Sequence, residues 1–333
     1  MQTQNSEPGT RTTTKGVQIM KRNTQSATRN LGRSILALAV TMLAALSAHA
    51  ATYYWDTNGT DPGAGTTPDG TWVTSGTSWN TAADGTGSSG TWAYNDSPVF
   101  SAGTDATAAT ITVQGTVYVG NIHFEEGSYT MVGTSTPSLE KAWWARSFTV
   151  DSGASVLFDS SLPFILRNEN NGNNADTVWT INGEARFEGT VTTWDWHTKY
   201  FKKTGTGTLV FDGNVGVDNG GTFNQVELLG GTTIVNGSWT GIERVWAWST
   251  LGGNGSISAS QNVNFNGGGT IAPGDSTADR IGTFNVTGPL NLASHDIGGG
   301  NVNLEVGTTA DKLNVTGAFN VSYHATNPAK ANV

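Results

Sequence analysis

The chain has 333 residues but no cysteine, and only 13% of its residues are charged. Without cysteine there are no disulfides, so the stability of the fold must come from backbone pairing and side-chain packing. The 44 glycines, together with many Thr, Asn and Ser residues, disfavour helices and favour short strands joined by tight turns. The 12 tryptophans, 12 phenylalanines and 7 tyrosines supply enough large side chains for a core, which excludes a disordered chain.

Long hydrophobic runs are also scarce, and the clearest one lies near the N-terminus. Basic residues precede the apolar run Ile35–Leu46, and the small-residue sequence Ala48-His49-Ala50 follows it. This order is typical of a secretory signal peptide over 1–50, with Met20 as an alternative start to Met1. The apolar run is too short to span a bilayer. We expect an exported protein with no membrane span in its mature chain.

Basic residues are few beyond this leader. The whole chain carries a net charge of −9 and residues 1–50 carry +5, which leaves −14 on the mature part. A strongly acidic domain repels nucleic acid and anionic membranes, so neither is expected as a partner.

One short phrase recurs along the mature chain: an apolar residue, any residue, Phe, and then Asp, Glu or Asn. Its copies are spaced at similar intervals if the last interval is taken as two repeats. A second repeated segment is clearer, because the sequence of Phe284–Ala293 closely matches that of Leu313–Ser322. Periods of roughly 20–50 residues are typical of a solenoid, whose stacked units share one core. A β-sandwich is the alternative. We predict an internal ladder of the five phenylalanines, which are Phe124, Phe158, Phe187, Phe211 and Phe265.

Several of these phrases resemble a known family. Gly205–Asn214 (GTGTLVFDGN) resembles the autotransporter-associated β-strand repeat, and Leu251–Ser276, with its LGG-G opening and the later IAPGDS, resembles a passenger phrase of that family. Asp311–Gly317 (DKLNVTG) and Tyr53–Trp72 are similar to segments of the same repeat-rich surface proteins. The resemblance covers most of 52–322. It implies a right-handed parallel β-helix, secreted or displayed on the outer cell surface of a Gram-negative-type bacterium, and it implies no chemistry.

The domain organisation follows from these signals. We predict an all-β fold: a signal peptide over 1–50, an aromatic-rich N-terminal cap over 51–109, β-helix repeats over 110–322 and a C-terminal tail over 323–333. The polar stretch Asn168–Thr177 is expected to leave the stack as a loop. The family's C-terminal membrane barrel is not recognisable in this sequence, so truncation at Val333 stays open.

Residues with catalytic potential are thinly spread. The histidines at 49, 123, 197, 295 and 324 are isolated, none at metal-ligand spacing, so no metal and no cofactor is predicted. The sequence GTGSSG at 85–90 precedes no helix and is expected to be a loop rather than a nucleotide site. Asp159, Glu188 and Asp212 each follow a ladder phenylalanine. Stacked at one corner, they could serve a polysaccharide lyase or glycoside hydrolase, which is the alternative function.

Tryptophans are the stronger candidates for binding. Three pairs recur at near-equal intervals: Trp143 with Trp144, Trp194 with Trp196, and Trp246 with Trp248. Each interval is close to two repeats, which would place the pairs on one side of the stack. Aromatic rings in a row could stack against sugar rings, since they combine an apolar face with a polar edge. Packing of these rings under a loop is the competing interpretation.

We therefore expect a non-enzymatic exported protein of the cell surface or matrix, structural or adhesin-like, whose tryptophans bind a polysaccharide or another surface ligand. The ends of a β-helix expose unpaired backbone groups, so self-association through the ends is also predicted.

Overall fold

A computed structural model describes residues 51–141, 147–167, 176–194, 200–218, 222–274, 281–292, 300–305 and 310–321. The predicted signal peptide, the predicted tail and most of the predicted polar loop lie outside these residues.

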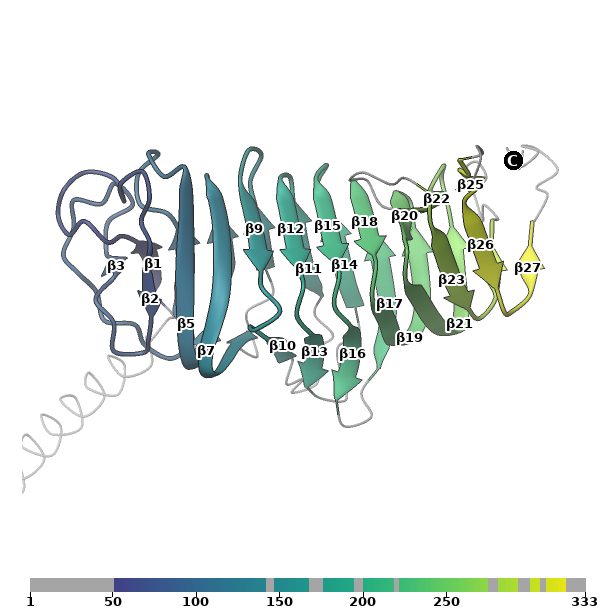
Figure 1. The fold of residues 1–333 in the computed structure, drawn as a ribbon, viewed down its shortest axis with the longest axis horizontal. Helices are drawn as coiled ribbons and strands as arrows, with labels where there is room; N and C mark the ends of the chain where they lie inside the picture. The colour runs from purple at the N-terminus through teal and green to yellow at the C-terminus, as the bar shows by residue number, and fades with distance from the viewer. Residues whose placement is uncertain are drawn as a thin grey trace, which may run out of the picture. The chain divides into compact units, whose positions relative to one another are not determined.

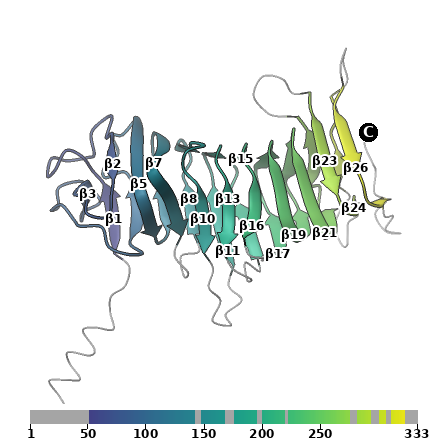
Figure 2. The same cartoon turned by 60° about the horizontal axis from the view of Figure 1, so that its bottom comes forward.

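The regular structure of the described residues is all β-strand, in one sheet of 27 strands (Figures 1 and 2). Pairing between these strands is parallel throughout except between β1 and β3 (Trp79–Asn80), which is antiparallel. The all-β prediction is confirmed, and the β-sandwich alternative is wrong, because a sandwich is built from antiparallel pairs.

The strands form three columns, defined by which strands pair side by side. Column A contains β1 (Thr52–Trp55), β4 (Ser97–Phe100), β6 (Ile122–Phe124), β8 (Ser147–Val150), β11 (Thr177–Ile181), β14 (Tyr200–Thr204), β17 (Phe223–Leu228), β19 (Ser238–Ala247), β21 (Ser256–Phe265), β24 (Leu290–Asn291) and β27 (Phe319–Asn320). Column B contains β2 (Gly70–Trp72), β5 (Ala108–Val119), β7 (Ser128–Lys141), β9 (Ser155–Phe158), β12 (Glu184–Phe187), β15 (Thr208–Phe211), β18 (Thr232–Val235), β20 (Thr250–Gly253), β22 (Thr270–Pro273) and β25 (Asn301–Val302). Column C contains β10 (Phe164–Arg167), β13 (Val191–Trp194), β16 (Val215–Asp218), β23 (Thr283–Thr287) and β26 (Lys312–Val315), together with parts of the long strands β5, β7, β19 and β21.

The three columns share one hydrophobic interior. Strands such as β8, β9 and β11 alternate buried and half-buried residues, as expected for strands with one face on a core. Phe148 of column A, Phe158 of column B and Phe164 of column C meet there, with ring centroids 5.3–6.2 Å apart. The chain therefore passes through A, B and C in turn, and each pass places its aromatic residues on the previous one.

The phenylalanine ladder is confirmed only in the middle of the chain. Phe158, Phe187 and Phe211 are register partners in column B, and the rings of Phe158 and Phe187 stack at 4.6 Å. Phe124 and Phe265 are buried too, but the prediction that they join this ladder is wrong, because both lie in column A.

For Phe265 the cause is a change in repeat length. Thr208, Thr232, Thr250 and Thr270 are successive register partners in column B, so the repeat becomes shorter after Thr232. Counting two repeats of the earlier length from Phe211 therefore does not reach the residue that occupies the same position in column B. The match of Phe284–Ala293 with Leu313–Ser322 is confirmed, since Phe284 pairs with Leu313 and Leu290 with Phe319.

The region predicted as a cap holds a cluster of four buried tryptophans. Neighbouring indole rings among Trp55, Trp72, Trp79 and Trp92 lie 4.7–5.1 Å apart, and Phe100 links three of them to Phe124. Parallel pairing already begins here, between β1 and β4 and between β2 and β5. The cluster thus packs directly on the start of the columns.

Lys203 is a buried lysine at the end of β14, where column A turns toward column B. Its side chain points inward and is fully buried. The Nζ atom donates to the carbonyl oxygens of Gly207 at 2.7 Å and Gly230 at 2.6 Å, and to Gly205 at 3.3 Å. One ammonium group thus ties the glycine turns of two successive repeats, which explains the sequence Lys-Thr-Gly-Thr-Gly at 203–207.

This burial predicts a pH-dependent stability. Burial lowers the pKa of Lys203 from 10.5 to about 8. Above pH 8 the unfolded chain keeps a proton that the folded protein has lost, so the free energy of unfolding is expected to rise with pH by up to about 3 kcal/mol. Urea unfolding of the wild type should be measured at several pH values below 10.0. Above that pH a second group lowers the free energy of unfolding, because burial raises the pKa of Tyr129 from 10.0 to about 12. A Lys203→Met variant should lose the rise, and an equal rise in the variant would contradict this assignment.

Candidate functional site

The predicted corner carboxylates do stack. Asp159, Glu188 and Asp212 follow the aligned strands β9, β12 and β15, and the backbone N–H of Glu188 and of Asp212 each donates to the ladder phenylalanine of the preceding repeat. Asn236 occupies the same corner one repeat later. The sequence therefore placed these side chains correctly at one edge.

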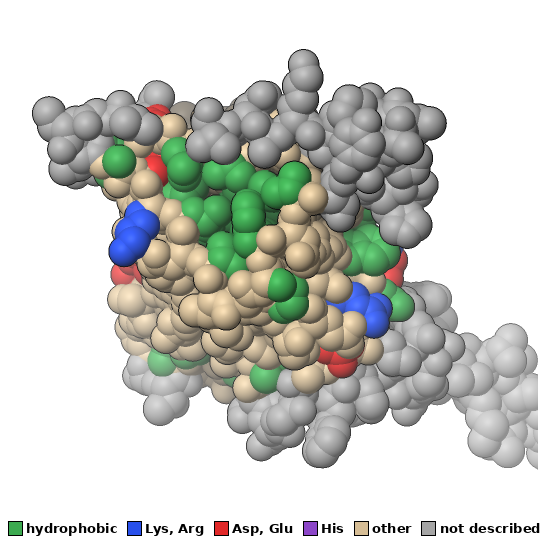
Figure 3. Space-filling view, turned by 90° about the vertical axis from the view of Figure 1, so that its right-hand side faces the viewer, with side chains coloured by type: hydrophobic (Ala, Val, Ile, Leu, Met, Phe, Trp, Pro, Cys, Tyr) green, Lys and Arg blue, Asp and Glu red, His purple; other side chains and the backbone are tan. Residues whose placement is uncertain are grey.

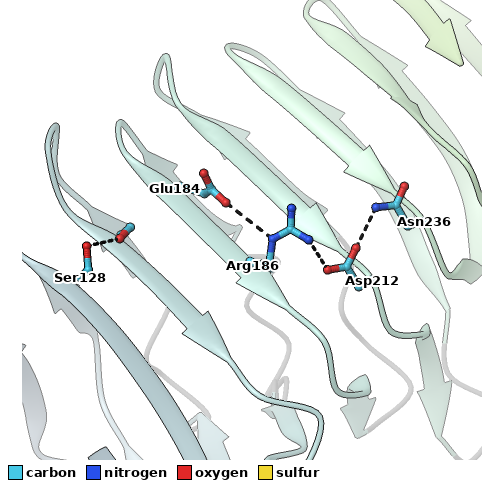
Figure 4. A network of polar contacts seen from close by, with 6 residues as sticks. Ser128, Glu184, Arg186, Asp212 and Asn236 are labelled. Atoms are coloured by element: carbon cyan, nitrogen blue, oxygen red, sulfur yellow. Dashed lines mark hydrogen bonds and ion pairs between the residues drawn. The ribbon is translucent and has the colours of Figure 1, made fainter. Parts of the chain in front are cut away.

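Two of these carboxylates have contacts that hold the backbone or neighbouring repeats together. The Asp212 carboxylate accepts hydrogen bonds from Arg186 Nη1 and, at 2.7 Å, from Asn236 Nδ2, so it bridges three repeats (Figure 4). Asp159 accepts hydrogen bonds from Ser161, which lower its pKa, whereas a general acid needs a raised pKa. Glu188 is exposed to solvent. Side chains at this corner form hydrogen bonds between successive repeats, as Ser128 and Ser155 do nearby (Figure 4).

His123 does not stand alone, contrary to the expectation from its sequence spacing. Its Nε2 lies 2.9 Å from Asp151 Oδ2, and its Nδ1 lies 3.4 Å from Glu125 Oε1. Burial raises the pKa of Glu125, against the opposing influence of His123. The sequence could not show this contact, because Asp151 belongs to the next repeat.

The predicted tryptophan row is only partly visible. Trp143, Trp144 and Trp196 lie outside the described residues. The backbone of Trp194 pairs with Arg167 and Asp218 in column C, whereas Trp246 pairs with Glu227 and Asn264 in column A. Trp194 and Trp246 are therefore not members of one row.

Trp246 and Trp248 form an aromatic pair on the outside of column A. Their rings meet edge to face at 5.8 Å, Trp246 is half-buried, and Trp248 is 37% exposed. Leu229, which is 41% exposed, occupies the position of Trp248 one repeat earlier. This register follows from the Trp248 N–H, which donates to the carbonyl oxygen of Leu228, the residue before Leu229. These three side chains, Leu229, Trp246 and Trp248, form an exposed apolar patch, called here the tryptophan patch.

Polar side chains adjoin this patch on the neighbouring outward positions. Glu227 and Asn264 are the register partners of Trp246 on either side, and Arg244 stands two residues before it. Asn264 donates to Asn262 at 2.7 Å, and Arg244 donates to Gln261. The Glu227 carboxylate is already engaged by Lys202 and Gln225. A ring with exposed apolar area beside amide and guanidinium groups can stack on a sugar ring and bond its hydroxyls.

A groove of about 200 Å³ lies elsewhere, on β18, β20 and β22 of column B. Its floor is low because Gly252 and Ala272 stand where the preceding repeat has Ile234. Two acids, Glu305 and Asp311, line it. Both oxygens of Asp311 accept backbone N–H groups at 2.8 Å, from Gly282 and Glu305, so its contacts hold two chain segments together.

The described part of the chain contains no cluster of three or more His, Asp or Glu residues placed to hold a metal ion. No helix within those ranges is long and apolar enough to cross a membrane. Comparison with known proteins gives no match to this chain among family models, curated proteins or solved structures.

Proposed function

We propose that the chain is an exported, non-enzymatic protein of the bacterial cell surface or matrix, folded as a right-handed parallel β-helix of the autotransporter-associated repeat type. Three parallel columns around one aromatic interior support the β-helix. The apolar run before Ala48-His49-Ala50 supports export. The cross-repeat ties of the corner carboxylates support a structural role over a catalytic one.

The tryptophan patch carries the binding part of this proposal. Its ligand is a polysaccharide, because one partly exposed indole beside Asn and Arg side chains offers both a stacking face and hydrogen-bonding groups. The net charge of the mature chain, −14 by sequence, favours neutral over acidic polymers.

Replacing Trp248 by alanine is expected to weaken retention on an immobilised neutral polysaccharide by about tenfold, because the stacking face is lost. Affinity electrophoresis in gels containing plant, algal or bacterial polysaccharides measures this retention. Tyr94→Ala is the matched control, since Tyr94 is also an exposed aromatic (56%) but lies in the N-terminal region against Tyr118.

Equal retention of the wild type and Trp248→Ala would contradict the patch as the binding surface. The same samples test the enzyme alternative. Release of new reducing or unsaturated ends would contradict the non-enzymatic proposal, and loss of that release in Glu305→Gln would assign the activity to the column B groove.

A further inference from the structure

The described columns A and C end in strands that are paired on one side only. β27 pairs with β24, and β26 pairs with β23; no other described strand adjoins them. Such an edge presents a row of backbone N–H and C=O groups ready to pair with another strand.

Apolar side chains continue onto this edge. Phe284, Val286 and Leu290 are fully buried because the next repeat covers them, and their register partners are Leu313, Val315 and Phe319. Leu313 and Val315 are only partly buried, and Phe319 is 51% exposed. Figure 3 looks onto this end and shows hydrophobic side chains gathered near the middle, with charged side chains toward the margin.

Asparagine side chains reach the same edge in two ladders. Asn314 Nδ2 donates to Asn285 Oδ1 at 2.8 Å, and in column A Asn320 donates to Asn291, which donates to Asn264. The last two amides of each ladder, Asn285 and Asn314 in column C and Asn291 and Asn320 in column A, all donate toward the preceding repeat. Among the described residues, nothing donates to Oδ1 of Asn314 or Asn320, so the edge ends in side-chain acceptors as well as backbone groups.

The opposite end of the columns is different. The tryptophan cluster packs there, and β3 pairs with the outer edge of β1. Asn80 Nδ2 has Asp56 Oδ2 and three carbonyl oxygens within hydrogen-bond distance of its two N–H groups, which fixes the covering loops. Head-to-tail stacking of copies would need a free column A edge at both ends, so the pairing of β3 with the outer edge of β1 disfavours an open filament.

We propose that two copies of this chain join through these edges in a closed, two-fold symmetric dimer. In a two-fold contact each β26 lies antiparallel to its counterpart, and the same patch serves both subunits. Leu313, Val315 and Phe319 of the two copies form its apolar centre. The dimer does not depend on the tryptophan patch, but it would carry two such patches and so strengthen attachment to a polymer.

The test is the mass of the full-length chain by sedimentation equilibrium over a wide concentration range. We expect a dimer for the wild type and a dissociation constant raised about a hundredfold or more in Phe319→Lys, because a charge replaces a central apolar contact. Tyr94→Lys, at the other end, is the matched control and should remain a dimer. Thermal unfolding of Phe319→Lys at low concentration should match wild-type monomer, since Phe319 is half-exposed.

Three results would overturn the proposal. A wild-type monomer at every concentration would mean that the edge is covered within one chain. Dimers that survive Phe319→Lys but not Tyr94→Lys would place the contact at the other end. Assemblies that keep growing with concentration would show head-to-tail stacking.

Discussion

Replacing Phe187 by alanine is expected to lower the free energy of unfolding by about 3–5 kcal/mol. Phe187 lies at the centre of the aromatic interior. Its ring stacks on Phe158 at 4.6 Å and lies 5.3 Å from both Phe164 and Trp179, so residues of all three columns surround it. Removing the ring would leave a cavity that parallel strands in fixed register cannot close.

Urea unfolding followed by tryptophan fluorescence would measure this loss. Phe319→Ala is the control, because it deletes the same side chain at a position that is 51% exposed. We expect it to change stability by well under the effect of Phe187→Ala. Equal losses in the two variants would contradict the burial of Phe187 in a tightly packed interior.

The second large effect concerns a glycine where successive turns touch. In Gly207→Ala the new Cβ would lie 1.9 Å from the carbonyl oxygen of Gly183, the equivalent turn one repeat earlier. That oxygen already accepts a hydrogen bond from the backbone N–H of Thr208, so neither group can move without breaking the ladder. We expect a loss of about 3 kcal/mol in the free energy of unfolding.

Gly216→Ala is the matched control for Gly207→Ala. Gly216 lies in β16, and a Cβ there would meet its nearest neighbour, Thr240 Oγ1, at an ordinary 3.5 Å. Neither glycine has a positive φ, so the two substitutions differ in contact rather than in backbone strain. Gly216→Ala should change stability by about 0.5 kcal/mol or less. A harmless Gly207→Ala would show that the turns are not in contact.

Much of the fold could be predicted because its local signals agree. Gly-Thr turns, strand alternation and the apolar-x-Phe phrase together predict stacked parallel strands, and the match between 284–293 and 313–322 reproduces the observed register. The ladder prediction failed at Phe124 and Phe265 because one phrase serves two columns. A buried phenylalanine beside a corner is equally suitable in column A and in column B, so the phrase alone cannot identify the column.

The candidate site was harder to predict, for a different reason. Interval counting placed Trp194 and Trp246 in one row, but column C passes from Val191 through Val215 to Trp239 in two equal repeats, and the longer interval to Trp246 leads into column A. Lys203 was visible in the sequence as the start of a Gly-Thr phrase. Its role depends on Gly230, which comes from the next repeat, and nothing local indicates that a lysine there is buried.

The short span of every strand pairing has a mechanical consequence. A strand in this sheet finds its partners only one repeat before and one repeat after, so no contact among the described strands clamps distant parts of the chain together. If the tryptophan patch holds a polymer, as proposed above, tension on that polymer would therefore load a few ladders at a time. The molecule would then lengthen in steps of one repeat, each absorbing work, instead of unfolding all at once.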